Sequence, residues 1–222
     1  MPDRPRMRVA VYIDGYNLYH GGRHQLGKAR GWKWLDLRSL LTGLVDDQRT
    51  STDPTIARIV YCTAQIDAGL NPDGHRDQGV YLNALSDTHS VDRIEYGEYV
   101  IGVKTRPLAV EGEGRRQRPV LVTSQWPVMI QSTLGKEVPD AHFIVSVLHQ
   151  EEKATDVNVA THMLVDILED HVDAVVAISN DSDLRLPVQF ARSRVPVGHV
   201  NPRGARFAGH LAGKQDEGVG NH

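Results

Sequence analysis

Five apolar residues in a row, Val9–Ile13, are followed directly by an aspartate, Asp14. An uninterrupted apolar run of this kind predicts a strand buried on both faces, as in a parallel sheet covered by helices. A second run, DAVVAIS over 173–179, is followed by Asp181 and Asp183. Charged residues are rarely buried without a partner, so two buried strands that both end in carboxylates require an explanation.

Helical patterns alternate with these strand-like runs. Apolar residues at helical spacing predict helices over 34–45, 72–88, 156–169 and 184–193. Shorter apolar runs predict further strands over 58–64, 92–101 and 195–200. Strands that alternate with helices predict a three-layer α/β fold, in which a mostly parallel sheet lies between two layers of helices.

The segment 102–150 interrupts this alternation. It has no helical period, contains two β-like pieces over 119–123 and 141–148, and is otherwise rich in glycine, proline and charge. We interpret it as a β-rich insertion, either an inserted β-arm or an extended crossover, within a single domain over 1–202. Residues 203–222 are glycine-rich and weakly apolar, which predicts a flexible tail.

Composition limits the chemistry more than the fold. The formal net charge of -3 does not suggest a polyanion ligand, so any basic residues that bind one must be gathered locally. A single cysteine, Cys62, excludes an intrachain disulfide and a thiolate metal cluster. No apolar run reaches membrane-spanning length and no signal core follows the first residues, so we expect a cytoplasmic protein without a membrane partner.

The acidic residues are expected to meet at one edge of the sheet. Sites in open parallel sheets lie at the carboxyl ends of the strands, which places Asp14 and the pair Asp181 and Asp183 together. Asp156 begins the predicted helix over 156–169, which precedes the strand over 173–179. It joins the other aspartates if that helix starts at the same edge of the sheet. Converging carboxylates stay ionised only beside cations, and Mg²⁺ or Mn²⁺ prefers such oxygen ligands. A metal held there can activate water for displacement at a phosphate.

Each of these residues also has a simpler interpretation. Asp14, which precedes a glycine, can be a turn residue, and Asp183 and Asp156 can cap helices. Asn17 can orient a ligand or cap the helix after the first strand. For any one aspartate alone the cap or turn is favoured, whereas two strands that end in acids at one edge favour a site.

Three further polar residues lie near the predicted edge. Ser179 can contact a metal ligand or a phosphate, although serine is common at strand ends. Lys153 can neutralise a phosphate or be a solvated surface charge. Arg185 can bind a phosphate or pair with Asp183.

Three segments in order resemble the NYN domain, a branch of the PIN-like nuclease superfamily: IDGYNLY at 13–19, KATDVNVATHMLVDIL at 153–168 and SNDSDLRLPV at 179–188. The resemblance covers residues 8 to about 200, and 102–150 is its least similar part. The family usually has Ser-Gly-Asp-Ser-Asp where this chain has Ser-Asn-Asp-Ser-Asp. Asn180 is therefore a departure from the pattern, at a position where asparagine also accepts positive φ.

The resemblance implies a metal-dependent endoribonuclease on a PIN-like, Rossmann-like α/β fold, with Mg²⁺ or Mn²⁺ as cofactor. It implies hydrolysis of RNA by a metal-activated water, leaving a 5′-phosphate and a 3′-hydroxyl. The family's site residues correspond here to Asp14, Asp156, Asp181 and Asp183, with Asn17 beside them.

Two other functions stay open. Haloacid-dehalogenase-like phosphohydrolases also place an aspartate after the first strand, but they normally require a second acid two residues later, where this chain has Tyr16. A tyrosine, with a pKa of about 10, is a poor general acid near neutral pH. The other open function is that of a non-catalytic RNA-binding module with the same fold.

An acidic site repels a phosphodiester backbone, so a nuclease needs basic flanks. Arg23 and Lys28 follow the first motif and lie near Trp32 and Trp34, a mixture that suits single-stranded RNA. The insertion carries a second basic group, Arg115, Arg116 and Arg118. Basic loops are also commonly just solvated surface, and the insertion can equally contact a second subunit in a homo-oligomer.

Overall fold

The computed structural model describes residues 6–27, 29, 31–47, 53–112, 118–123, 130–204, 208 and 211. The chain divides into two compact units, one formed by Met1–Tyr99 with Glu152–His222 and the other by Val100–Glu151. The second unit closely matches residues 102–150, which the sequence predicts to be an insertion. The two roles considered for this segment, an inserted β-arm or an extended crossover, stay predictions.

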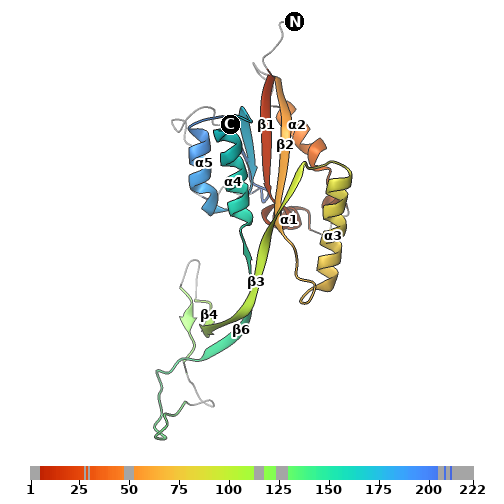
Figure 1. Cartoon of the computed structure of the whole chain (residues 1–222). Coiled ribbons are helices and arrows are strands. Elements are labelled where there is room, and N and C mark those ends of the chain that lie inside the picture. Colours follow the sequence, from red (N-terminus) through yellow and green to blue (C-terminus); the bar gives the residue numbers. More distant parts are fainter. Residues whose placement is uncertain are drawn as a thin grey trace. The chain divides into compact units, whose positions relative to one another are not determined.

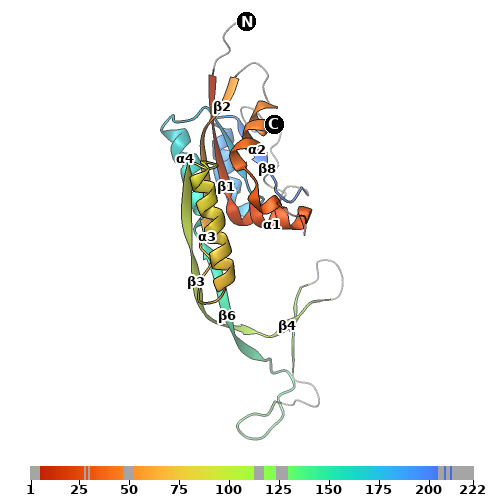
Figure 2. The ribbon, with the colours of Figure 1, turned by 90° about the vertical axis from the view of Figure 1, so that its right-hand side faces the viewer.

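A six-stranded sheet forms the centre of the first unit (Figure 1 and, turned by 90°, Figure 2). By their residue ranges, two of its strands include residues of the second unit. The strand order is β6-β3-β2-β1-β7-β8. Parallel pairing joins β1 to β2, β1 to β7, β2 to β3 and β7 to β8. The bounds are Arg6–Asp14 for β1, Asp53–Ala64 for β2, Arg93–Pro107 for β3, Ile144–Lys153 for β6, Ala174–Ile178 for β7 and Val197–Val200 for β8.

The helices cover both faces of this sheet, so the three-layer α/β fold with a mostly parallel sheet is confirmed. In Figure 1, α4 and α5 lie on one side of β1 and β2, and α2 and α3 lie on the other. The helical elements are α1 Gly15–Leu26, η1 Trp32–Trp34, α2 Leu37–Asp46, α3 Pro72–Asp87, α4 Thr155–Leu168, η2 Ser182–Leu184 and α5 Arg185–Arg192. The helix expected over 34–45 begins only at Leu37, because Asp36 caps it by accepting from the Ser39 amide at 3.1 Å.

Strand β1 shows why its apolar run is uninterrupted. Ala10 and Tyr12 pack with the α4 and α5 face of the core, whereas Val9, Val11 and Ile13 pack with the α2 and α3 face. All five are buried, and β1 is hydrogen-bonded on both edges. A strand with no solvent-facing side needs apolar residues at every position.

The second unit is described on its own. Besides parts of β3 and β6, it contains an antiparallel pair of short strands, β4 Ala109–Val110 and β5 Val120–Leu121. Two isolated bridges, Thr123 to His142 and Gln131 to Glu137, extend the β-type pairing among its described residues.

Of the flexible tail predicted over 203–222, only residues 203, 204, 208 and 211 are among the described residues, and the flexibility of the tail stays a prediction. Leu211 is 0% exposed and belongs to the core cluster on the α4 and α5 face. Its carbonyl accepts from Arg192 Nη2 at 2.8 Å, and the Ala208 amide donates to Asn180 Oδ1 at 2.9 Å.

Among the helices that the structure describes, none combines the length and the apolar character needed to cross a lipid bilayer.

Candidate active site

Asp14 is the last residue of β1 and the N-cap of α1. Only 3% of it is exposed. Its Oδ1 accepts from the Asn17 amide at 3.0 Å and its Oδ2 accepts from Asn17 Nδ2 at 2.6 Å. The capping role considered for Asp14 is therefore present, and Asn17 supports the cap instead of being one. A carboxylate also suits the positive end of the helix dipole.

Gly15, the residue after Asp14, allows the Tyr61 ring to lie close to the backbone. A Cβ atom at Gly15 would lie 2.7 Å from the Cε1, Cζ and Oη atoms of Tyr61. Tyr61 comes from the neighbouring strand β2 and is itself buried. Because Gly15 has no Cβ atom, Tyr61 can pack against the start of α1. Gly15 itself is part of the helix.

The loop after β7 is bonded to Asp14. Ile13 and Ile178 are partners in the β1–β7 register, so both strands end at the same edge. Ser179 is fully buried, and its Oγ donates to Asp14 Oδ2 at 2.9 Å. The same Oγ accepts from the Asp181 amide at 3.1 Å. The structure thus brings Asp14, Ser179 and Asp181 together, at the point where the order of strands along the chain reverses.

A second link joins the same two segments. The Asn180 amide donates to Asn17 Oδ1 at 3.3 Å. Asn17 consequently holds Asp14 through its amide and side-chain nitrogens and the β7 loop through its oxygen. The residue that departs from the family pattern, Asn180, has its own side chain bonded to the Ala208 amide.

The acidic groups at this edge repel one another. Burial raises the pKa of Asp14, hydrogen bonds from Asn17 and Ser179 lower it, and the charge of Asp181 raises it further. Glu152, at the end of β6, has a pKa raised by burial and also by the charges of Asp14 and Asp156, against a hydrogen bond from Thr155 that lowers it. Four carboxylates from different elements are therefore coupled at this edge.

Asp183 and Asp156 are placed differently from their expected capping roles. The Asp183 amide donates to Asp181 Oδ1 at 3.0 Å, so Asp181 is the cap of η2 and the Asp183 side chain is exposed. Asp156 lies in the first turn of α4, whose N-cap is Ala154 with a φ of 72° and no side-chain cap. The simpler alternative, in which Asp183 and Asp156 cap helices, is wrong, because the N-cap residues are Asp181 for η2, Leu184 for α5 and Ala154 for α4.

The carboxylate oxygens at this edge are the kind of ligand that a hard divalent cation prefers. Among the described residues, no three His, Cys, Asp or Glu side chains are grouped to bind one ion. Mg²⁺ is commonly held by one or two carboxylates and keeps several waters. Asp14 and Asp181 can supply such a pair, and a bound cation would offset the burial and, to a smaller extent, the repulsion from Asp181 that raise the pKa of Asp14. The set of four aspartate ligands stays a prediction.

The basic residues predicted to bind substrate are spread over the chain. Arg23, Lys153 and Arg185 are exposed at the end of α1, the end of β6 and the start of α5. Arg118 is exposed in the second unit. Lys28, Arg115 and Arg116 lie outside the described residues.

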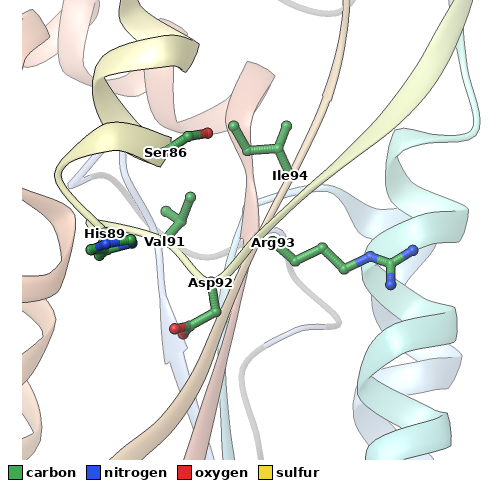
Figure 3. Close-up of a pocket in the computed structure, with 6 residues that line it drawn as sticks. All are labelled: Ser86, His89, Val91, Asp92, Arg93 and Ile94. Atoms are coloured by element: carbon green, nitrogen blue, oxygen red, sulfur yellow. The ribbon is translucent and has the colours of Figure 1, made fainter.

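A shallow pocket of about 210 Å³ lies at the amino end of β3, away from the strand ends that carry the acids. Figure 3 shows its lining residues, Ser86, His89, Val91, Asp92, Arg93 and Ile94. The side chains of Asp92 and Arg93 point in different directions there. Because its polar groups do not converge, this pocket is not a second candidate site.

Glu152 and Tyr61 are the residues at this site that the sequence did not indicate. The strand expected over 141–148 in fact continues to Lys153, which places Glu152 beside the other strand ends. A strand prediction that ran through the polar residues 149–153 would have found Glu152. Tyr61 resembles any other core tyrosine in the sequence.

No family model matches this chain. The chain is 26% identical over 213 residues to the 6-hydroxy-3-succinoylpyridine 3-monooxygenase of Pseudomonas putida, a match that covers 88% of this chain. The chain spans 59% of the length of that protein. A crystal structure of a protein of unknown function from Vibrio parahaemolyticus aligns with 90% of this chain and 83% of its own, at a TM-score of 0.42 and 13% identity.

Proposed function

We propose that this protein is a metal-dependent ribonuclease that hydrolyses RNA phosphodiester bonds. The observation that carries the proposal is the bonding of Asp14 to Ser179 and of Ser179 to Asp181 at the edge where the strand order reverses. This arrangement supports the function that the NYN-like segments imply, because it joins two of those segments through their acidic residues.

In this proposal Asp14 and Asp181 hold Mg²⁺ or Mn²⁺. The bound cation would supply a water of lowered pKa and would neutralise charge that develops on the phosphate. Asn17 and Ser179 fix the orientation of the Asp14 carboxylate through the three bonds that it accepts. Orientation of this kind is what metal ligands need from their neighbours.

Glu152 is our candidate for the proton acceptor. Its raised pKa brings the carboxyl group closer to the working range of a general base, and its coupling to both Asp14 and Asp156 places it among the acids. A carboxylate that is not needed as a ligand can take the proton that the attacking water loses.

The test uses a 5′-labelled single-stranded RNA incubated with Mn²⁺, with Mg²⁺ or with EDTA. We expect cleavage with either cation and none with EDTA. Asp14→Asn should lower the cleavage rate by more than the ~10–100-fold that removal of a residue supporting a metal ligand typically costs. Asp87→Asn, which alters an exposed carboxylate at the end of α3, serves as the matched control and should cleave normally.

The same experiment separates the rival functions. Retention of RNA in a gel without any cleavage would favour a non-catalytic binding module. A trapped phosphate on Asp14 would favour a phosphohydrolase of the haloacid-dehalogenase type. Cleavage that survives in EDTA, or in Asp14→Asn, would contradict the proposal.

The curated relative gives a second candidate, which is oxygenation of a hydroxypyridine ring. Its support is a match that covers most of this chain. Such a reaction at C3 would place one atom of O₂ on the ring and release the other as water, with two electrons and two protons supplied through a reductant such as NADH. The bond from C3 to the succinoyl group would break, and the acyl group would leave to water as a carboxylic acid. NADH oxidation that requires 6-hydroxy-3-succinoylpyridine and occurs without RNA would favour this candidate.

A further inference from the structure

Four aromatic rings form a continuous row beside the acidic site. Tyr16 and His20 lie one turn apart on α1, with ring centroids 4.2 Å apart. His20 meets Tyr19 edge-on at 5.3 Å, and Tyr19 meets Trp32 at 5.6 Å. The row begins two residues after Asp14.

The tyrosines in this row face solvent. Tyr16 is 49% exposed and Tyr19 is 40% exposed, although both belong to a helix that packs on the sheet. Aromatic rings carry a large apolar surface, and a row of them left open to water is more typical of a contact surface than of a core.

Glycines and a proline hold the row in place. A Cβ atom at Gly22 would lie 2.7 Å from the Trp32 ring, so Trp32 packs directly on the helix backbone. A Cβ atom at Gly21 would lie 2.5 Å from Pro202 Cβ. The loop that contains Pro202 is thereby fixed along α1, and Gln25 Nε2 donates to the Arg203 carbonyl in the same loop.

Cations surround the rings. Lys33 Nζ lies 5.9 Å from the centroid of the Tyr19 ring. Arg23 follows His20 by three residues on α1, which is about one helical turn. Arg203 lies in the loop along α1, and its carbonyl accepts a hydrogen bond from that helix. Burial lowers the pKa of His20, and the charges of Arg23 and Arg203 lower it further. Basic groups interleaved with aromatic rings are what proteins use to bind single-stranded nucleic acid.

The row also adjoins the acids. Asp14 is the N-cap of α1, and Tyr16, the first ring of the row, lies in the first turn of that helix. A base stacked on the row would therefore lie close to the acidic edge.

We propose that Tyr16, Tyr19 and His20 form a stacking site for an unpaired nucleobase, with Lys33, Arg23 and Arg203 contacting the adjoining phosphates. This inference rests on the proposed ribonuclease function and adds the residues that hold the strand beside the cleavage site. A flat heteroaromatic ring from a small molecule shares the stacking chemistry. We infer a nucleobase of a strand, because three separate cations match the several charges of a phosphate backbone, whereas a succinoylpyridine carries a single carboxylate.

The experiment measures binding without cleavage. A fluorescein-labelled single-stranded RNA is titrated in EDTA with Asp14→Asn as the parent, and its anisotropy is recorded. Tyr16→Ala and Tyr19→Ala, each made in the parent, should weaken binding about 10-fold, as alanine does at base-stacking aromatics. Tyr16→Phe, which keeps the ring, should bind like the parent, and circular dichroism verifies that each variant is folded.

Tyr96→Ala is the matched control. Tyr96 is 51% exposed, and none of the recorded ring contacts among the described residues connects it to the row. It should leave affinity unchanged, which would show that the row matters and not exposed tyrosines in general.

Two further ligands identify what the rings bind. An abasic strand of equal length should bind the parent as weakly as the intact strand binds Tyr16→Ala, because it has phosphates without bases. Free 6-hydroxy-3-succinoylpyridine should not displace the RNA. Displacement by that ring, or equal affinity for abasic and intact strands, would overturn the proposal.

Failure of this proposal differs from failure of the proposed function. If the unsubstituted protein cleaves RNA while Tyr16→Ala and Tyr19→Ala bind as well as the parent, the stacking site is wrong and the ribonuclease stands. If the unsubstituted protein cleaves no RNA while both alanine variants bind about 10-fold more weakly, the stacking site stands and the ribonuclease is wrong.

Discussion

The hydroxyl of Ser179 donates to the Oδ2 atom of Asp14 across 2.9 Å, although the two residues are 165 positions apart in the chain. This bond joins the ends of β1 and β7, the two strands that are followed by acids. It also connects Asp14 to Asp181, whose amide donates to the same Ser179 oxygen. The account of this protein as a metal-dependent enzyme depends on that connection.

Ser179→Ala should raise the pKa of Asp14 and weaken metal binding. The substitution removes a hydrogen bond that lowers the pKa of this buried carboxyl group. Loss of a residue that supports a ligand typically costs ~10–100-fold in metal affinity. Calorimetric titration with Mn²⁺ measures the change. Ser193→Ala, which removes an exposed hydroxyl bonded to the Phe190 carbonyl, is the control and should bind Mn²⁺ normally.

The stability of the metal-free protein should fall as the pH rises above the range in which ordinary carboxyl groups titrate. Asp14 and Glu152 both have pKa values raised in the folded state. The native protein therefore binds protons at these groups more tightly than the unfolded chain does. Their contribution is fully present below the unfolded-state pKa of about 4 and is lost as the pH passes through the raised folded-state values.

Urea denaturation of the native sequence and of Asp14→Asn, from pH 4 to neutral pH in EDTA, measures this difference. The unfolding free energy of the native sequence should decline relative to that of the variant as the pH rises. Curves that run parallel would show that Asp14 does not titrate with a raised pKa. Saturating Mn²⁺ should reverse the decline, because a ligand that binds only the folded state stabilises it.

Gly15→Ala should destabilise the protein, because the added Cβ atom would meet the Tyr61 ring at 2.7 Å. Overpacking of this kind typically costs ~1–3 kcal/mol. Gly43→Ala is the matched control, since no atom lies within 4 Å of a Cβ atom added at that position on α2. It should stabilise the protein by ~0.5–1 kcal/mol through helix propensity. Chemical denaturation measures the change in unfolding free energy for both variants. Two changes of the same sign would contradict the close packing of Tyr61 on Gly15.

Asp166→Ala should cost far more stability than Asp173→Ala. Asp166 is buried on α4, where it accepts from Tyr12 Oη at 2.7 Å and from Arg58 Nη1 at 2.8 Å. Removing one partner of a buried ion pair costs ~3–5 kcal/mol. Asp173 pairs with Arg8 at the surface, and such pairs are worth ~1 kcal/mol or less. Similar losses in guanidinium denaturation would show that the Asp166 network is solvated in solution.

The sequence was sufficient to predict the layers of the fold and the shared edge of Asp14 and Asp181. Both follow from strong local signals: apolar runs such as Val9–Ile13 mark strands buried on both faces, and parallel pairing forces their carboxyl ends together. The bounds of most elements agree with the expected ranges to within a few residues.

The details of the site depend on contacts between distant residues, which no local pattern contains. Glu152 lies in the polar part of a strand, after the apolar residues of that strand, so it resembles a surface residue in the sequence. By residue type, Asp181 and Asp183 are equally suited to cap a helix. In the structure Asp181 is the cap, and its position is held by the hydrogen bond from its amide to Ser179 Oγ. Leu211 lies in a glycine-rich tail, yet it fills a place in the core.

The most direct measurement is a crystal structure of the protein soaked in Mn²⁺, with anomalous diffraction recorded to locate the metal. We expect an anomalous peak within ligand distance of carboxylate oxygens of both Asp14 and Asp181. A peak that contacts neither of them, or no peak in crystals of a protein that cleaves RNA with Mn²⁺, would show that these residues do not hold the metal.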